Sequence, residues 1–181
     1  MTSSGAQGRV AQAELTRSGL FMVRLFALFR TVIYAGLFIG LVLVYLPAQV
    51  AFASGIPRPP MALPQFAGLA IATLGGAIAL WCVISHAIIG RGTPAPFDPP
   101  RRLITQGPYR FVRNPMYVGA ASALAGAAVF YLSWPLLVYG CVLLVAAHLF
   151  VVFYEEPTLA RTFGQEYEAY KRRVGRWLPA L

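Results

Sequence analysis

Residues 116–154 read MYVGAASALAGAAVFYLSWPLLVYGCVLLVAAHLFVVFY and contain no Asp, Glu, Lys or Arg. As one helix rising about 1.5 Å per residue, this stretch would be nearly twice as long as the roughly 30 Å thickness of a bilayer's hydrocarbon core. Near its middle, Ser133-Trp134-Pro135 offers an interfacial tryptophan and a proline of the kind that begins helices. The stretch therefore predicts a hairpin of two membrane-spanning helices, residues 116–133 and 135–154.

Two further segments, residues 25–46 and 66–89, are also long and apolar enough to span a membrane. The whole chain is 58% hydrophobic and only 12% charged, whereas a typical soluble domain is about 25% charged. We therefore expect one membrane domain over residues 1–181, an all-α, polytopic bundle of about four transmembrane helices. Residues 1–18 precede the first apolar run, and we expect them to be flexible.

Small residues recur every four positions in two of the expected spans. They are Gly68, Ala72 and Gly76 in the second span, and Gly119, Ala123 and Ala127 in the third. Faces of this kind let two helices approach closely in lipid, where packing replaces the hydrophobic effect. The pattern predicts a close helix–helix contact without indicating a function.

Basic residues are concentrated on one side of the expected spans. They are Arg9, Arg17 and Arg24 before the first span, Arg91, Arg101, Arg102, Arg110 and Arg113 in the loop of residues 90–115, and Arg161, Lys171, Arg172, Arg173 and Arg176 in the tail of residues 155–181. The loop of residues 47–65 carries only Arg58. By the positive-inside rule, both termini and the loop of residues 90–115 are predicted to be cytoplasmic. In a bacterium this membrane would be the inner one.

The formal net charge of +9 raises the question of nucleic-acid binding. The basic residues flank apolar segments instead of lining one basic face, so membrane topology explains the charge and we expect no nucleic-acid partner. The two cysteines, Cys82 and Cys141, form no CxxC pair. We expect no metal site.

A polar segment leads into the third span. Asn114-Pro115 is typical of a helix start, with Asn as N-cap and Pro at the first helical position. Backbone N–H groups at such a terminus, together with Arg110 and Arg113, suit a carboxylate or phosphate. The same arginines also satisfy the positive-inside rule, so the segment alone favours neither interpretation.

The fourth span is followed by Glu155-Glu156-Pro157. If Pro157 begins a new helix, both carboxylates lie at its favourable N-terminus. This explains why glutamates are tolerated there but not why there are two among only six acidic residues. A ligand with a cationic group or several hydroxyl donors would explain the pair.

The order of these motifs resembles the isoprenylcysteine carboxyl methyltransferase and phospholipid methyltransferase superfamily. The resemblance covers about residues 90–179. It is carried by Gly107-Pro108-Tyr109-x-x-x-Arg113-Asn114-Pro115-Met116-Tyr117-x-Gly119, by Glu155-Glu156, by Phe163-Gly164-x-x-Tyr167-x-x-Tyr170 and by Arg176-Trp177-Leu178-Pro179.

The resemblance implies an integral membrane enzyme that binds S-adenosylmethionine at the cytoplasmic face and methylates a lipid-like or small hydrophobic acceptor, with the C-terminal tail completing the cofactor site. The cofactor contacts that it implies are Tyr109, Arg113, Asn114, Pro115, Tyr117, Glu155 and Glu156. The residues that it implies near the reacting groups are Tyr167, Tyr170 and Arg173. Many members have His where this chain has Asn114. Asn cannot act as a base near neutral pH, so any proton chemistry of that His is absent here.

Several alternatives stay open at this point. The chain also suits a membrane reductase that uses NADPH, or a non-enzymatic four-helix membrane protein. The acceptor could be an amine, a carboxylate or a thiol, and the oligomeric state is not determined. His86 and His148 lie within expected spans, and we interpret both as packed core residues in preference to catalytic ones.

Overall fold

The computed structural model describes residues 39–57, 59–90 and 102–180, together with the single residues 29, 33, 36 and 37. The segment expected to be flexible, residues 1–18, lies outside this part. So do most of the first half of the first expected span and residues 91–101 of the loop that is expected to be cytoplasmic. The expectations for those segments stay predictions.

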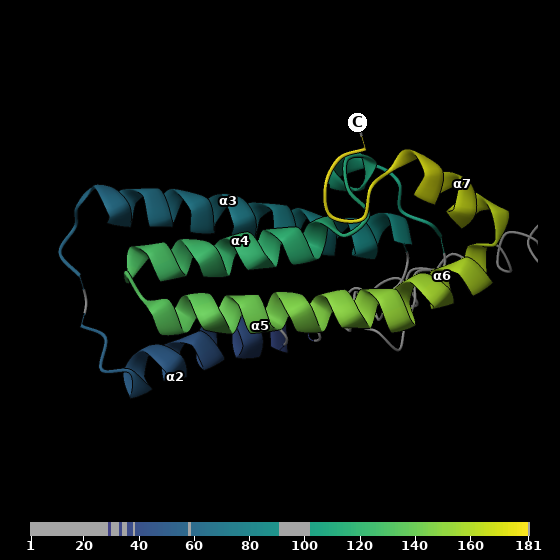
Figure 1. Ribbon diagram of the computed structural model, residues 1–181. Helices are drawn as coiled ribbons and strands as arrows, with labels where there is room; N and C mark the ends of the chain where they lie inside the picture. The colour runs from purple at the N-terminus through teal and green to yellow at the C-terminus, as the bar shows by residue number, and fades with distance from the viewer. Residues whose placement is uncertain are drawn as a thin grey trace, which may run out of the picture.

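The described ranges are helical and contain no β-strand, which confirms the all-α prediction for them (Figure 1). The α-helices are α2 (Leu46–Ala53), α3 (Leu63–Ser85), α4 (Pro115–Phe130), α5 (Trp134–Phe150), α6 (Glu156–Phe163) and α7 (Gln165–Arg173). Three π-helical segments are η1 (Ile39–Tyr45), η2 (His86–Gly90) and η4 (Val151–Glu155), and η3 (Gly107–Arg110) is a 3-10 helix.

Proline marks the first turn of each long helix. α3, α4 and α5 each carry a proline at one of their first two positions, where a missing backbone N–H costs no hydrogen bond. The turn between α4 and α5 ends at Ser133, whose hydroxyl accepts a hydrogen bond of 3.3 Å from the backbone N–H of Leu136. The central apolar stretch is thus folded into two antiparallel helices that lie side by side (Figure 1).

Glycines bring α3 and α4 into direct backbone contact. A Cβ atom on Gly75 would lie 2.6 Å from the Ala123 nitrogen, and one on Gly119 would lie 2.7 Å from the Gly75 oxygen. The prediction that Gly76 lies on the contact face is wrong, because a Cβ atom on Gly76 would have no neighbour within 4 Å. With 3.6 residues per turn, a position seven residues after Gly68 stays on its face better than one eight residues after it.

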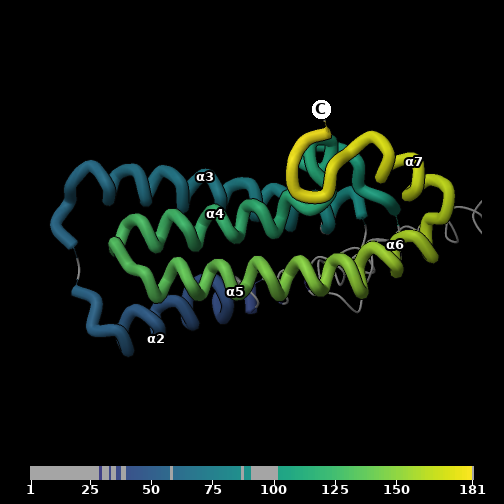
Figure 2. Tube along the Cα trace, in the orientation of Figure 1, coloured from purple at the N-terminus to yellow at the C-terminus, as the bar shows by residue number. Residues whose placement is uncertain are grey.

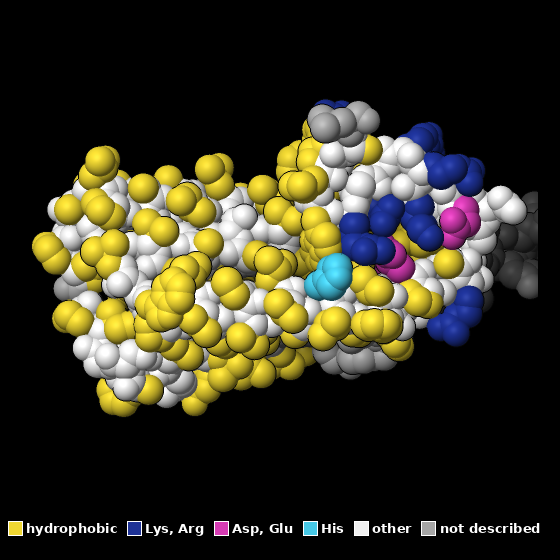
Figure 3. All heavy atoms as spheres, in the orientation of Figure 1, with side chains coloured by type: hydrophobic (Ala, Val, Ile, Leu, Met, Phe, Trp, Pro, Cys, Tyr) yellow, Lys and Arg dark blue, Asp and Glu magenta, His cyan; other side chains and the backbone are white. Residues whose placement is uncertain are grey.

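Two helical stretches are long and apolar enough to cross a membrane, Leu63–Gly90 with a mean hydropathy of 2.1 and Trp134–Phe163 with 2.6. The apolar helices Gly40–Ala53 and Pro115–Phe130 are shorter. The count of four transmembrane helices therefore stays a prediction. Many large apolar side chains on these helices are exposed, and Figure 3 shows them covering the helical bundle while Lys and Arg gather at the end where α6 and α7 lie.

The polar end is built by one long helix and a returning tail. α5 continues through η4 into α6 without a break, so the helix extends well beyond residue 154, where the fourth span was expected to end. Gly164 then adopts a φ of +51°, a conformation that favours glycine, and α7 follows. After α7 the chain returns to the segment that precedes α4 (Figure 2).

Candidate active site

The segment before α4 is joined to the C-terminal tail by backbone contacts. Val112 and Gly175 form an isolated parallel β-bridge, in which the Arg113 N–H donates to the Gly175 oxygen at 2.8 Å. The hydroxyl of Tyr170 donates to the Tyr109 carbonyl oxygen at 2.6 Å. A Cβ on Gly175 would overlap the Leu178 carbonyl oxygen, so the tail can turn this tightly only with glycine. These contacts bring together motifs that are about 60 residues apart.

Glu156 lies at the centre of this junction. It accepts a hydrogen bond of 2.8 Å from Arg113 Nη2, and Arg176 binds it through Nε at 2.9 Å and Nη2 at 2.8 Å. Arg113 Nη1 also donates to the carbonyl oxygens of Lys171 and Val174, at 3.2 and 3.0 Å. One carboxylate thus ties the start of α6 to the segment before α4 and to the tail. Arg176 belongs to the Arg-Trp-Leu-Pro motif, but nothing in the neighbouring residues marks it as a site residue.

Arg113 keeps one unused donor. Its Nε atom is buried and has no hydrogen-bond partner within the described ranges. Buried donors in folded proteins almost always have a partner, and leaving one without costs free energy. The Nε atom is therefore a donor left over for an oxygen atom of a ligand or of a water molecule.

Glu155 has a different environment from its neighbour Glu156. Its Oε2 accepts a hydrogen bond of 3.1 Å from the Tyr117 hydroxyl. No Lys or Arg of the described segments forms an ion pair with it. A carboxylate that is bonded only to a neutral phenol can still attract a cation or accept hydroxyl donors. Of the two adjacent glutamates, Glu155 is the one without an ion-pair partner among the described residues, and burial raises the pKa of its carboxyl group.

Aromatic rings stand beside this carboxylate. The Trp177 ring lies 6.3 Å from the Tyr117 ring at an interplanar angle of 68°, and 5.9 Å from the His148 ring. Trp177 Nε1 donates to His148 Nδ1 at 3.1 Å. His148 is exposed on α5, so its interpretation as a core residue is wrong. The spacing of about two helical turns between His148 and Glu155 was visible in the sequence, but the exposure of His148 was not.

Tyr109 and His86 form a second, buried polar contact. Their hydroxyl and Nδ1 atoms are 3.2 Å apart, and the same Nδ1 is 3.0 Å from the Cys82 carbonyl oxygen. Burial raises the pKa of Tyr109 well above its ordinary value. Its phenol is therefore neutral at physiological pH.

Tyr167, Tyr170 and Arg173, expected near the reacting groups, occupy two kinds of position. Tyr167 and Tyr170 are buried in one cluster with Val174, and burial raises the pKa of both. Neither can supply a phenolate base near neutral pH. Arg173 is exposed, and its Nε donates to the Ala169 carbonyl oxygen of its own helix at 3.3 Å.

Asn114 and Pro115 begin α4 as expected, but Asn114 does not cap it. Its side chain makes no capping hydrogen bond. Instead Nδ2 donates to the Arg176 carbonyl oxygen at 3.3 Å. Both residues are buried, and Asn114 adds another bond between this segment and the tail.

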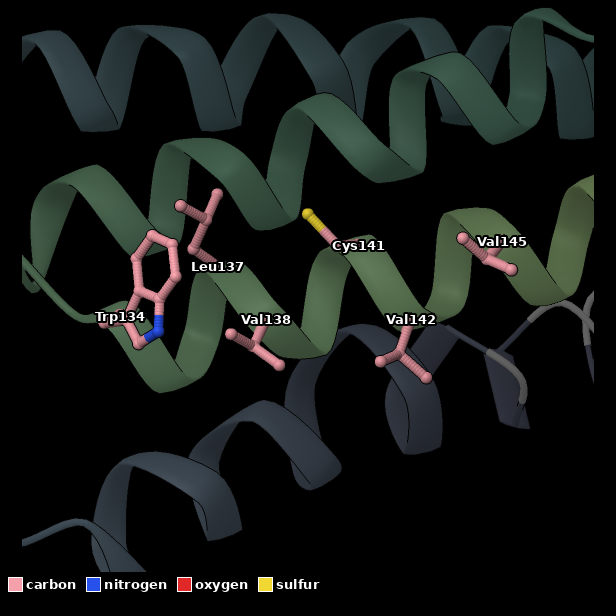
Figure 4. A pocket seen from close by; sticks show the side chains of 6 residues that line it. All are labelled: Trp134, Leu137, Val138, Cys141, Val142 and Val145. Atoms are coloured by element: carbon pink, nitrogen blue, oxygen red, sulfur yellow. The ribbon is translucent and has the colours of Figure 1, made fainter.

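The described chain offers no metal site, and a groove along α5 is apolar. No group of three or more His, Cys, Asp or Glu residues lies close enough there to hold a metal ion. An open apolar groove of about 430 Å³ runs along α5 (Figure 4), lined by Trp134, Leu137, Val138, Cys141, Val142 and Val145. It carries no charged or catalytic side chain and begins at the opposite end of α5 from Glu155.

Comparison with known proteins gives a family match that includes the residues around Glu155 and Glu156. Residues 63–166 match a family model described as phospholipid methyltransferase. The match covers more than half of the 181-residue chain, from the start of α3 into α7, and includes Arg113, Tyr117, Glu155 and Glu156. A search of curated proteins gave no significant match.

Proposed function

Because the chain belongs to the phospholipid methyltransferase family, we propose that it transfers a methyl group from S-adenosylmethionine to a lipid or small hydrophobic acceptor at the cytoplasmic face of a membrane. The observation that carries this proposal is the difference in environment between the two adjacent glutamates. Glu156 is neutralised by Arg113 and Arg176, whereas Glu155 is bonded only to Tyr117 among the described side chains. In the proposed site this unpaired carboxylate contacts the methyl donor, and the Glu156 junction supports it.

The side chains present fit the polar groups of S-adenosylmethionine. The unused Arg113 Nε donor suits its carboxylate, and the available Glu155 carboxylate suits its ammonium group or its ribose hydroxyls. The rings of Tyr117 and Trp177 suit a cation such as the sulfonium. When bound, this cofactor supplies an electrophilic methyl group. On this basis Arg113, Tyr117, Glu155 and Trp177 hold it, while Glu156 and Arg176 act as positioning residues.

The protein's own contribution is alignment and exclusion of water. Methyl transfer is an in-line displacement that needs no covalent enzyme intermediate, so geometry supplies most of the acceleration. The Glu156 junction holds the tail against α4 and α6 before any ligand binds, which reduces the entropy lost in ordering the site. Where the acceptor is a protonated amine, Glu155 is the group placed to receive its proton, because the tyrosines are neutral and Glu156 is paired.

The exterior of the bundle supports the membrane location. Apolar side chains such as Leu74, Leu80 and Val142 are more than half exposed on helices that are long enough to span a bilayer. In water such surfaces would cause association. The proposed topology has four transmembrane helices with both termini and residues 90–115 cytoplasmic, and it rests on the distribution of Lys and Arg.

Calorimetric binding of S-adenosylhomocysteine to the detergent-purified chain tests the proposal. We expect micromolar binding that weakens at least about tenfold in Glu155→Gln, which loses one charge-assisted contact without changing shape. The matched control Glu166→Gln alters an exposed carboxylate on α7 and should leave binding unchanged. A folded wild-type chain that binds NADPH but not S-adenosylhomocysteine would overturn the proposal in favour of the reductase.

A further inference from the structure

The hydrogen bond between Trp177 and His148 fixes the tautomer of the histidine. An indole N–H can only donate, so His148 Nδ1, 3.1 Å from Trp177 Nε1, must carry a lone pair. In the neutral ring the proton then lies on Nε2. His148 is therefore a hydrogen-bond donor through Nε2 and has no free basic nitrogen while Trp177 is in place.

The position of His148 makes this donor unusual. The residue is exposed on α5, seven residues or about 10 Å before Glu155 along the helix. Its neighbour Leu149 and the nearby Val145 are exposed apolar residues of a helix long enough to span a membrane. Figure 3 shows that the apolar bundle gives way to a region where Lys and Arg gather, and α6 and α7, which follow His148 in the chain, lie at that end. At that depth water becomes scarce, and an N–H without an acceptor costs free energy.

No hydrogen bond from His148 Nε2 to another of the described residues is present. This exposed N–H is therefore open to an acceptor beyond the described residues, and we consider a lipid oxygen. Lipid molecules carry oxygen atoms at this level, in the ester carbonyls and the phosphate, just below the polar group that would reach Glu155. Trp177 contacts both His148 and Tyr117, so such a lipid would lie directly beside the proposed methyl-transfer site.

We propose that His148, held by Trp177 as the Nε2–H tautomer, is a specificity-determining residue that donates a hydrogen bond to an ester or phosphate oxygen of the lipid acceptor. This inference rests on the proposed function. It assigns to His148 a role as donor and excludes a role as general base.

Two substitutions separate this role from simple attachment of the tail. In His148→Asn, the amide oxygen replaces Nδ1 and can still accept from Trp177, but the Nε2 donor is lost. In His148→Gln, the amide nitrogen replaces Nε2 and the acceptor for Trp177 is lost. If His148 only fastens the tail, the Asn variant should behave like the wild type and the Gln variant should be defective. The proposal predicts the reverse for lipid binding.

The test is a titration of the detergent-purified full chain with dioleoylphosphatidylethanolamine, followed by native mass spectrometry. We expect saturable binding that weakens about tenfold in His148→Asn, because this variant loses one hydrogen bond to a lipid oxygen. In His148→Gln, which keeps the donor, we expect binding to weaken by less than about threefold. The diether analogue of the same lipid distinguishes the two oxygen sources. If His148→Asn weakens binding of the diether lipid as much as binding of the ester lipid, the acceptor is the phosphate. If His148→Asn no longer weakens binding of the diether lipid, the acceptor is the ester carbonyl.

Ring ¹⁵N resonances of histidine provide a second readout that does not depend on lipid affinity. We expect an unprotonated Nδ1 and a protonated Nε2 for the resonance that disappears in His148→Asn. A protonated Nδ1, wild-type lipid affinity in His148→Asn, or no saturable lipid binding would each overturn the inference. Binding of S-adenosylhomocysteine by the same preparations shows whether the proposed function fails together with it or survives alone.

Discussion

Arg176 binds both carboxylate oxygens of Glu156, through Nε at 2.9 Å and Nη2 at 2.8 Å, across 20 positions of sequence. Parallel, two-point contact of this kind fixes direction as well as distance. It holds the tail in the position from which Trp177 reaches His148 and from which Gly175 pairs with Arg113. The order of the proposed site therefore depends on this pair.

Replacing Arg176 should loosen the tail without unfolding the bundle. We expect Arg176→Ala to lower the free energy of unfolding by about 1–2 kcal/mol, a value reduced from that of a fully buried pair because the Arg176 side chain is 34% exposed. Limited proteolysis should then cleave after α7 at a higher rate than in the wild type. Arg172→Ala, at an exposed position on α7, is the control. Equal proteolysis of both variants would contradict the role of the pair.

Removing the Tyr117 hydroxyl should affect ligand binding more than stability. In Tyr117→Phe the bond of 3.1 Å to Glu155 is lost while the ring beside Trp177 remains. Glu155 then lacks its one described partner and its orientation, so we expect the affinity for S-adenosylhomocysteine to fall about three- to tenfold. Calorimetry measures this effect. Unaltered affinity would show that Glu155 needs no orienting group.

The contact between α3 and α4 predicts opposite results for two adjacent glycines. Gly75→Ala places a Cβ 2.6 Å from the Ala123 nitrogen, so the backbones must separate and we expect a loss of about 1–3 kcal/mol. Gly76→Ala meets nothing within 4 Å and should be neutral or stabilise the helix by up to about 1 kcal/mol. Thermal unfolding in detergent compares them. Equal melting temperatures would contradict this helix register.

Alkaline pH should destabilise the chain through its buried tyrosines. Burial raises the pKa of Tyr109, Tyr167 and Tyr170 in the folded state, so the folded chain binds these protons more tightly than the unfolded chain. Their contribution is complete below the unfolded pKa of about 10 and is lost as pH rises through and above it, by up to about 1.4 kcal/mol per pH unit for each group.

The variant Tyr167→Phe isolates one of these groups, because it keeps the buried ring and removes the titrating hydroxyl. We expect the free energy of unfolding to fall less steeply between pH 9.5 and about 11 than in the wild type. Denaturant titrations at a series of pH values measure the slope. An identical slope for the two proteins would contradict the role of Tyr167 in this titration.

Local signals predicted the helical architecture well. The prolines at positions 115 and 135 predicted two helix starts because the effect of a missing N–H depends only on neighbouring residues. The choice between Gly75 and Gly76 was missed, since a spacing of four residues drifts away from a face that follows 3.6 residues per turn.

The site depended on contacts that local sequence does not encode. Asn114 has the signature of a capping residue, yet its side chain bonds the backbone of Arg176, which the fold brings close. Glu155 and Glu156 are indistinguishable in the sequence, and only the positions of Tyr117, Arg113 and Arg176 give them different environments. Long-range packing, not residue type, leaves one of them without an ion pair among the described residues.

The most direct test of the central claim is transfer of a labelled methyl group. Membranes containing the chain are incubated with methyl-labelled S-adenosylmethionine and a total lipid extract, and label is then measured in the organic phase. We expect the wild type and Glu166→Gln to form labelled lipid, and Glu155→Gln to form at least about tenfold less. Equal labelling of lipid by the wild type and by Glu155→Gln would contradict the proposed activity. So would the absence of labelled lipid when a folded wild type has been shown to bind both S-adenosylhomocysteine and the lipid.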